Sequence, residues 1–500
     1  MILSKSVNPN SFFTNFMHDM EFTIFSLCIA FALLFVFFYP LIITVKLKEK
    51  IYPNPHLPPG NLGWPVIGET LGFIRAGFEG KPERFIRERM EKYDSRVFKT
   101  CLLGEDMIVF CGTAGHKLLF SNENKLVRTW WPSSVGKLFK TCLLMKAGDD
   151  AKRMRRMMMM SFLSPNALMK YVERIDMITQ QHIATYWEGK EEVKVHPTVK
   201  LYTFELACHL LASVEDPLLI SKLASHFNIF LKGVMSFPVN FPGTTFYKSI
   251  RAADAIREEL IKLIAKQTRE ALGSKQDLLS RLVVIADSNG KFLTEMEVAD
   301  NILLLLFSSH DTSSSAITLL LKYLGQMPQV FENVLREQIG IAESKEQGEL
   351  LKWEDIQKMK YTWNVASEVM RLSPPAIGAF REALVDFTYS GYTIPKGWKL
   401  HWSTGSTHKD ETLFPNPETF DASRFEREGA TPYSYVPFGG GPRMCPGYEF
   451  ERLLILVFIH NMIKRFKWDL LIPDEKFGYD PMLSPSQGLP IRLQPHQCST

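Results

Sequence analysis

Hydrophobic residues run without a single charge from position 22 to position 45, where Phe, Leu, Ile and Val dominate. At about 1.5 Å per helical residue, this stretch is long enough to cross a hydrocarbon core of about 30 Å. A cleaved signal peptide has a shorter apolar region behind a basic start, whereas residues 1–21 contain one lysine, Lys5, and no arginine. We therefore predict a retained transmembrane helix over residues 22–45, preceded by a lumenal segment, residues 1–21.

The residues after the apolar run indicate how the chain is oriented. Lys46, Lys48 and Lys50 follow the run directly, and positive charge beside a membrane span marks its cytoplasmic side. Residues 46–62 are basic and rich in proline, which cannot continue a helix and restricts the residue before it to extended geometry. We predict a stiff tether here and a domain over residues 63–500 that lies on the cytosolic side of the membrane, in a single-pass arrangement.

Beyond the tether, the pattern is typical of one α-dominated domain with small β-sheets. Alternating positions predict a strand, turn and strand over residues 97–111 and short strands over residues 381–402. No internal repeat, low-complexity stretch or second linker interrupts this pattern. The helical periodicity predicts helices over residues 152–282, with a break at 237–243, and over residues 296–324, 356–372 and 447–466.

Composition and charge narrow the class of protein only slightly. Hydrophobic residues make up 46% of the 500 residues and charged residues 22%, as in globular proteins that bury a large core. The formal net charge of +4 gives no reason to expect nucleic acid as a partner. Seven cysteines, an odd number without a CxxC pair, indicate neither a disulfide framework nor a zinc site. Scattered thiols are typical of a reducing compartment.

One cysteine lies in a glycine-rich stretch that suits a sulfur ligand to haem iron. Residues 438–447 have the sequence FGGGPRMCPG. A thiolate bound to iron lies close to the porphyrin plane, so the backbone around it must carry few side chains, which these glycines allow. Arg443 supplies a cation for a haem propionate, and N–H groups where a helix begins near Gly447 can stabilise the negative sulfur. A glycine-rich turn with a stray cysteine is the alternative interpretation.

The spacing of the residues decides between these interpretations. Phe438, Gly441, Arg443, Cys445 and Gly447 fill every fixed position of the haem-binding signature FxxGxRxCxG, and in this the chain resembles the cytochrome P450 family. The resemblance extends over essentially the whole chain and implies the family's mainly α fold with small β-sheets, here preceded by the transmembrane helix. It also implies haem b (iron protoporphyrin IX) as the cofactor, Cys445 as the axial ligand to the haem iron, and O2 as a substrate.

A charged pair lies on the helix predicted over residues 356–372. Glu368 and Arg371 are three residues apart, so they face one another, although such pairs are common on helix surfaces and contribute little there. The sequence FDASRF at 420–425 resembles the family's segment that supplies a second arginine, Arg424. The resemblance thus implies a structural triad of Glu368, Arg371 and Arg424, with a role in core assembly and haem retention.

The long apolar helix contains the sequence SSHDTS at residues 308–313. Ser and Thr hydroxyls can bond back to the preceding turn and bend a helix, which is one interpretation of this sequence. The oxygen-binding helix of the family carries a similar sequence, which implies that Thr312 hydrogen-bonds dioxygen in the haem pocket and Asp311 supplies protons through water. Ser308 and Ser309 replace the usual small apolar residue and glycine, so the shape of the oxygen groove stays open.

Two further arginines are candidates for binding the haem propionates by family position. Arg155 stands where the family often has an arginine four residues after an aromatic residue, although Ala151 holds the place of the aromatic. Arg381 resembles the family's arginine shortly after a double proline. The basic residues of 152–156 are either a solvated face or a docking surface for an acidic redox partner.

The sequence contains neither of two common nucleotide-binding motifs. Neither GxGxxG nor GxxxxGK[ST] occurs, so the electrons of NADPH must reach the chain through a separate protein, implied to be an NADPH–cytochrome reductase. A run of four methionines, residues 157–160, is interpreted as core packing. The other implied partners are the lipid bilayer and a small hydrophobic terpenoid.

Within the family, the likeness is strongest to plant triterpenoid oxidases. It implies a monooxygenase that inserts one oxygen atom from O2 into a pentacyclic triterpene such as β-amyrin, by hydroxylation or successive oxidation of a methyl group. An oxidase of another plant isoprenoid (taxane, steroid hormone or abscisic acid type) is the alternative. A reductase-independent isomerase or dehydratase is disfavoured, because such enzymes tend to lose the Asp–Thr pair. The segments that carry the likeness are 57–69, 120–127, 397–410, 437–447 and 472–476.

The apolar segments also predict where the substrate lies. Residues 303–307 and 375–379 are apolar and are predicted to flank the haem face, and family position adds Trp130, Trp131 and residues 484–489. The apolar loop at 237–246 is predicted as a membrane-facing entrance, although ordinary membrane attachment explains its composition equally well.

Overall fold

The computed structural model describes residues 56–64, 67–269, 278–285, 290–426 and 429–496. The predicted lumenal segment, the transmembrane helix at 22–45 and most of the tether lie outside these residues. None of the helices within the described ranges has the length and apolar character needed to span a bilayer.

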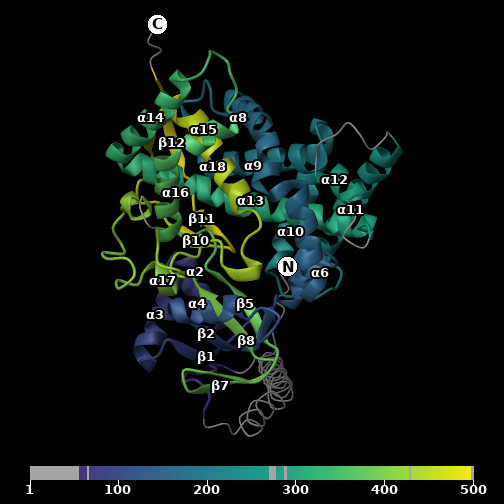
Figure 1. The fold of residues 1–500 in the computed structure, drawn as a ribbon, viewed down its shortest axis with the longest axis vertical. Helices are drawn as coiled ribbons and strands as arrows, with labels where there is room; N and C mark the ends of the chain where they lie inside the picture. The colour runs from purple at the N-terminus through teal and green to yellow at the C-terminus, as the bar shows by residue number, and fades with distance from the viewer. Residues whose placement is uncertain (1–55, 65–66, 270–277, 286–289, 427–428, 497–500) are drawn as a thin grey trace, which may run out of the picture.

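Helices make up most of the described chain, as the periodicity predicted (Figure 1). Short 3₁₀ turns and one π-helical turn, Met159–Leu163, connect or extend several of them. The α-helices are α2 Thr70–Phe78, α3 Pro82–Tyr93, α4 Gly112–Ser121, α5 Ser133–Phe139, α6 Gly148–Met158, α7 Pro165–Leu168, α8 Val172–Tyr186, α9 Val195–Ala212, α10 Pro217–Val234, α11 Thr245–Arg269, α12 Leu278–Val284, α13 Glu295–Gln326, α14 Pro328–Glu343, α15 Trp353–Lys358, α16 Lys360–Leu372, α17 Gly405–His408 and α18 Tyr448–Ile463.

The strands form four small sheets among the described residues. In the largest, the order is β1-β2-β8-β5-β3, and β2 and β8 run parallel while the other neighbours are antiparallel. Three strands pair as β4-β12-β9, and the hairpins are β6-β7 and β10-β11. The strands are β1 Val97–Leu102, β2 Glu105–Phe110, β3 Val127–Thr129, β4 Glu192–Lys194, β5 Gly378–Ala383, β6 Phe387–Tyr389, β7 Tyr392–Ile394, β8 Lys399–Ser403, β9 Phe466–Leu470, β10 Phe477–Tyr479, β11 Leu483–Pro485 and β12 Pro490–Pro495.

The large sheet and the helices occupy different parts of the molecule. Strands β1, β2, β5 and β8 lie with α3 and α4 in the lower part of the view, while α8, α9, α13, α16 and α18 gather above them (Figure 1). The cavity described below is lined by residues from both parts. It therefore lies where the sheet meets the helical core.

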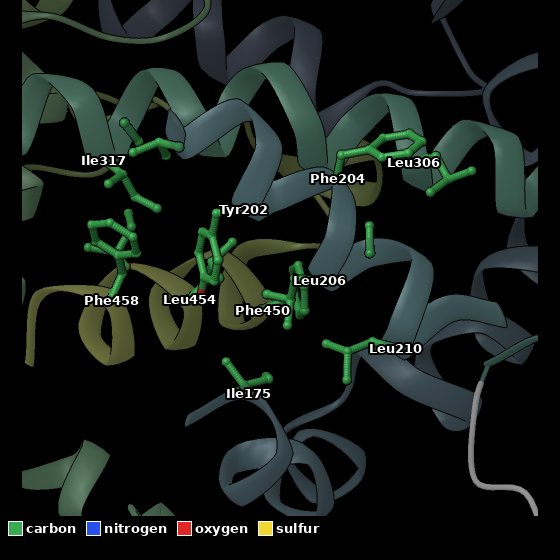
Figure 2. Packing of buried hydrophobic residues seen from close by; sticks show 14 of the residues in the cluster. Ile175, Tyr202, Phe204, Leu206, Leu210, Leu306, Ile317, Phe450, Leu454 and Phe458 are labelled. Carbon is green, nitrogen blue, oxygen red and sulfur yellow. The ribbon is translucent and has the colours of Figure 1, made fainter. Parts of the chain in front are cut away.

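The longest helix, α13, runs through the helical core. A capping box starts it, in which the Thr294 hydroxyl accepts from the backbone of Glu297 and the Glu297 carboxylate accepts from the backbone of Thr294. The buried residues of α13 lie on nearly all sides of the helix, as expected for a helix that runs through a core. Figure 2 shows this packing, with side chains of α9, α13 and α18 meeting at Tyr202, Phe204, Leu206, Ile317, Leu454 and Phe458.

The structure corrects two predicted helix bounds. The helix expected over residues 356–372 is two helices, α15 and α16, because the backbone of buried Met359 leaves the helical region with ψ at 54°. The helix expected over residues 447–466 ends at Ile463, and Phe466 starts strand β9 instead. The predicted break at 237–243 is confirmed, since α10 ends at Val234 and α11 begins at Thr245.

The described end of the tether contacts the catalytic body. The backbone N–H of Lys99 in β1 donates to the Pro59 carbonyl over 2.8 Å, and the N–H of Thr393 in β7 donates to the His56 carbonyl over 2.8 Å. The chain therefore enters the body along the outer strands of two sheets, and the domain boundary at residue 63 stays a prediction.

Candidate functional site

A cavity of about 400 Å³ lies between α13 and the loop that precedes α18. Most of its lining is apolar, with a few charged and hydroxyl-bearing side chains at particular places. Such a cavity, with polar groups converging on a mainly apolar wall, is the usual form of a small-molecule or cofactor site. Its apolar lining includes Leu143, Leu144, Leu211, Leu304, Leu305, Phe307, Met370, Ala376, Ala379 and Met482.

Cys445 faces this cavity from the loop before α18. The loop is held by the N–H of Cys445, which donates to the Phe438 carbonyl over 2.9 Å, and by Met444 N–H, which donates to Gly441 over 3.0 Å. Burial raises the pKa of the free Cys445 thiol to about 11, while the Gly447 N–H and the charge of Arg155 act in the opposite direction. A thiol in this position needs a bound cation to become a thiolate near neutral pH, and a metal ion supplies one.

The glycines of the loop have more than one function. Gly439, with φ at +70°, lines the cavity, in keeping with a backbone that a flat group can approach. Gly440 and Gly441 do not line it. A Cβ at Gly440 would lie 2.4 Å from the Phe120 ring, and one at Gly441 2.2 Å from the Phe120 carbonyl oxygen. Close packing against α4 therefore requires glycine at both positions. This role was not predicted from the sequence.

Three arginines predicted to bind haem propionates, Arg155, Arg381 and Arg443, line the cavity together. Arg381 Nε lies 3.0 Å and Arg443 Nε 3.1 Å from different oxygens of a single buried carboxylate, Glu123. Among the described residues, Arg155 has no ion-pair partner. Trp131 adds a buried indole N–H without a hydrogen-bond partner in the described part of the chain.

This arrangement fits the cofactor that the sequence predicted. Arg381 and Arg443 share one carboxylate, and Arg155 has no acidic partner among the described residues, so positive charge is left for an anionic ligand such as a pair of propionates. A sulfur ligand, a side-chain-free backbone at Gly439 and an apolar wall complete the requirements of haem. The donor set is therefore consistent with haem b.

The predicted oxygen-binding residues lie on the cavity side of α13. Ser308, Ser309, Asp311 and Thr312 line the cavity, and α13 stays one continuous α-helix past them. The Thr312 hydroxyl donates to the Ser308 carbonyl over 2.5 Å, and the Ser309 hydroxyl to Leu305 over 2.8 Å. Both hydroxyls thus bond back to the preceding turn, and each still has lone pairs to accept a further hydrogen bond.

Asp311 is tied to two basic groups. Its Oδ1 lies 2.9 Å from His310 Nδ1 and 2.8 Å from Lys200 Nζ. Burial raises the pKa of this carboxyl, but the hydrogen bond from His310 and the charges of His310 and Lys200 outweigh burial and bring the pKa down to about 2. Asp311 is therefore ionised at neutral pH, and it connects the cavity with the half-exposed Lys200.

The predicted triad comes together outside the cavity. Glu368 and Arg371 are fully buried and form a bidentate pair, with 2.7 Å from Nε to Oε2 and 2.8 Å from Nη2 to Oε1. Arg424 Nε lies 3.4 Å from Glu368 Oε1. Arg371 also donates to the carbonyls of His408, Pro417 and Thr419. The triad thus joins α16 to the segment ahead of the Cys445 loop.

Several apolar predictions differ from the observed lining. Trp131 faces the cavity, but Trp130 packs on Phe380 and lies beneath Lys399 instead. The stretch at 375–379 lines the cavity as predicted, whereas no residue of 484–489 does so and Met482 takes that place.

The prediction of core packing for residues 157–160 holds only in part, and the entrance predicted at 237–246 stays a prediction. Met157 and Met158 are buried in the core, but Met160 is 63% exposed. In the loop at 237–246, Phe237 is 89% exposed and Phe241 67% exposed, whereas Phe246 is buried. Strongly exposed aromatic residues of this kind are typical of a surface that contacts a lipid or another protein.

Two carboxyl groups at the cavity had no signal in the sequence. Glu123 holds Arg381 and Arg443, and its Oε1 also accepts from the Thr129 backbone. Glu451, in the first turn of α18, lines the cavity and accepts a short hydrogen bond from Ser313 of α13. Both are single acidic residues without a motif, and the fold alone brings them to the site.

Comparisons with known proteins agree with this geometry. The family model described as cytochrome P450 matches residues 58–485. The β-amyrin 28-monooxygenase of Solanum lycopersicum is 53% identical over 92% of this chain and 97% of its own length, and that of Vitis vinifera is 52% identical over 89% and 94%. A β-amyrin 6-β-monooxygenase of Solanum lycopersicum is 46% identical over 95% and 99%. The structure of retinoic-acid-bound cyanobacterial CYP120A1 is similar with a TM-score of 0.80 and 32% identity, covering 88% of this chain and all of the other.

Proposed function

The chain belongs to the cytochrome P450 family, and from this premise we propose that it is a monooxygenase that oxidises the C-28 methyl group of β-amyrin. The observation that carries the proposal is the apolar cavity between Cys445 and the Asp311–Thr312 face of α13. Identities of 50–53% with several relatives named β-amyrin 28-monooxygenase support the substrate.

The reaction needs both electrons and protons. One oxygen atom of O2 enters the C–H bond and the other leaves as water, which takes up two electrons and two protons. Haem, when bound, activates the dioxygen. The electrons of NADPH arrive through a separate reductase, for which the exposed side chains of Lys152 and Arg156 offer a docking surface.

Each group of residues at the site has a part in this proposal. Cys445 would hold the iron, and Arg155, Arg381 and Arg443 would bind the acidic groups of the cofactor. Thr312 positions a water molecule in the cavity. Asp311, ionised and connected to Lys200, passes protons to it from solvent.

The apolar wall excludes bulk water and holds the hydrocarbon skeleton. Leu304, Leu305 and Phe307 of α13 face the same space as Leu143 and Leu144. A fused-ring hydrocarbon has almost no polar group to satisfy, so such a wall can bind it by burial of apolar surface alone. We place the protein at the endoplasmic reticulum membrane, anchored by residues 22–45, where a hydrophobic substrate of this kind concentrates.

The test is expression with a plant reductase in yeast that makes β-amyrin, with a reduced carbon-monoxide difference spectrum to verify the thiolate-bound haem. We expect the 28-alcohol, or the aldehyde and acid that further oxidation gives, dependent on the reductase. A product oxidised at C-6, or at another position, would contradict the C-28 assignment. Oxidation of other isoprenoids with no turnover of β-amyrin would contradict the substrate class.

A further inference from the structure

One wall of the cavity is formed by residues 138–146, which run from the last turn of α5 through a 3₁₀ turn, Leu143–Met145, towards the start of α6. Leu143 and Leu144 of this segment line the cavity. Lys140, at its turn, has φ at +42°, a conformation that is strained for a residue with a side chain. Contacts with other parts of the chain must therefore hold residues 138–146 in the observed conformation.

Those contacts come from one face of the first two turns of α13. Glu297, Asp300 and Asn301 are spaced i, i+3 and i+4, so they point the same way. Asp300 Oδ2 accepts from the Thr141 backbone N–H at 2.8 Å and from the Thr141 hydroxyl at 2.5 Å. Asn301 Oδ1 accepts from the Leu143 N–H at 2.9 Å.

A buried arginine completes the arrangement. Arg257 of α11 is 2% exposed and Asp300 is fully buried, and their Nε and Oδ1 atoms lie 2.6 Å apart. The same guanidinium donates to the Leu138 carbonyl and to Asp254. The end of the segment is tied twice more, since Lys146 pairs with Glu297 at 3.1 Å and the Lys146 carbonyl accepts from Arg443 at 2.8 Å.

We propose that Arg257, Asp300 and Asn301 form a specificity latch, which fixes residues 138–146 as a wall of the substrate cavity and so determines which triterpene skeleton and which carbon reach the oxidising site. The substrate part of this inference rests on the proposed function. The latch residues do not line the cavity, so they are positioning residues that act through Leu143 and Leu144.

The helix α13 explains why a latch at this place affects selectivity. Its polar face at 297–301 holds the wall, and farther along the helix Leu304 and Thr312 face the substrate space. Residues 138–146 and the oxidising site thus both contact the same rigid helix. When this segment is held in place, the substrate skeleton is held at one distance from the oxidising site. A loosened segment lets the skeleton bind in more than one position.

The variant that tests the latch is Thr141→Val, which removes one hydroxyl from Asp300 and leaves the buried Arg257–Asp300 pair intact. Thr362→Val is the matched control, because its hydroxyl also donates over 2.5 Å to a carboxylate, Glu337, at a helix contact that does not line the cavity. Asp300→Asn, which also removes the charge opposite Arg257, is the stronger second variant.

Hydrogen exchange of the full-length holoenzyme is the first measurement. In Thr141→Val we expect amide exchange of residues 138–146 to rise about tenfold, as for the loss of a hydrogen bond to a charged group. Thr362→Val should leave the amide exchange of residues 138–146 unchanged. We expect the two variants to lower the melting temperature of the protein by similar amounts. Equal exchange of residues 138–146 in both variants and the wild type would overturn the latch.

Ligand binding and product analysis are the second measurement. We expect Thr141→Val to weaken β-amyrin binding, followed by the haem absorbance shift, and to give an increased share of products oxidised away from the main position. Faster exchange with unchanged affinity and product ratio would overturn the role in specificity. If the wild-type protein binds no triterpene, the proposed function fails, and the exchange result still decides whether the latch exists.

Discussion

Glu451 shows how a single side chain acquires unusual properties from its surroundings. The residue is buried in α18 at the wall of the cavity, and one of its oxygens has no hydrogen-bond partner among the described residues. Burial raises the pKa of its carboxyl to about 7, although the hydrogen bond from Ser313 lowers it. Between the usual pKa of 4.5 and pH 7, the folded state therefore binds more protons than the unfolded chain, and stability falls as the pH rises through this window.

We predict that Glu451→Gln removes this pH dependence, because an amide of the same shape carries no proton to lose. The largest gain over the wild type, on the order of 3 kcal/mol, is expected above pH 7, and little or none at pH 5. Melting temperatures of both proteins across pH 5–8 provide the measurement. Curves that stay parallel over the whole range would show that Glu451 is not protonated on folding.

We predict that Cys445→Ser abolishes both activity and the thiolate-type spectrum with carbon monoxide. A hydroxyl group cannot replace the electron donation of sulfur, even where its size and position are similar. The matched control is Cys142→Ser, at a buried thiol that does not line the cavity and should keep the spectrum if the variant folds. A thiolate spectrum that survives Cys445→Ser would mean that another residue binds the iron.

We predict that Thr312→Ala uncouples electron use from product formation. The hydroxyl that positions water is lost, so reduced oxygen leaves as hydrogen peroxide while NADPH is still consumed. A proton-relay group contributes about 10²–10⁴-fold in rate, and the measurement is product formed per NADPH. Ser309 lies one turn away and also faces the cavity, so the double variant with Ser309→Gly should be compared. Unchanged coupling in both variants would contradict the role of this helix face.

The residue scale also shows what could be predicted from sequence. Cys445 and Arg443 belong to a local motif and were identified from a ten-residue stretch. Glu123 was missed, because its partners Arg381 and Arg443 are hundreds of positions away in the chain and a lone glutamate carries no periodic signal. The packing role of Gly441 was missed for the same reason, since Phe120 comes from a distant helix.

Among the elements, long helices were predicted better than their ends. The length of α13 follows from a long apolar pattern with a capping box at one end and Pro328 beyond the other. The separation of α15 from α16 at Met359 had no signal, because Met is a good helix former and only tertiary packing turns the backbone there. Sheet pairing such as β2 with β8 joins distant segments and could not be read from local pattern.

We predict that Arg371→Lys loosens the contact between α16 and the segment at 417–424. A lysine can keep the charge near Glu368 but cannot reach its second oxygen and three carbonyls together. The loss should be about 2–3 kcal/mol, as for buried hydrogen bonds to a charged group that are left unmade, with lower haem content after purification. The control for replacing an arginine by a lysine is Arg336→Lys, at an exposed position of α14. Full haem content and unchanged thermal stability in Arg371→Lys would contradict the structural role.

At the scale of the whole molecule, we predict that removal of residues 1–50 releases much of the protein from membranes without loss of haem binding. The site residues all lie beyond residue 122, and the described tether end still contacts β1. Peripheral binding should persist through the exposed Phe237 and Phe241. Fractionation of yeast microsomes, with spectra of each fraction, is the measurement. A truncated protein that binds no haem would assign residues 1–50 a part in folding.

The carboxylate of Glu123 has a consequence for how the protein attracts its cofactor. Because it pairs with both Arg381 and Arg443 from within the chain, it offsets the repulsion between these two neighbouring cations. Arg155 adds a third cation at the same edge without a partner of its own among the described residues. We therefore expect this group of arginines to present a net positive charge to a cofactor that carries two acidic groups. We expect this charge to attract the acidic cofactor at long range, before any bond to sulfur forms.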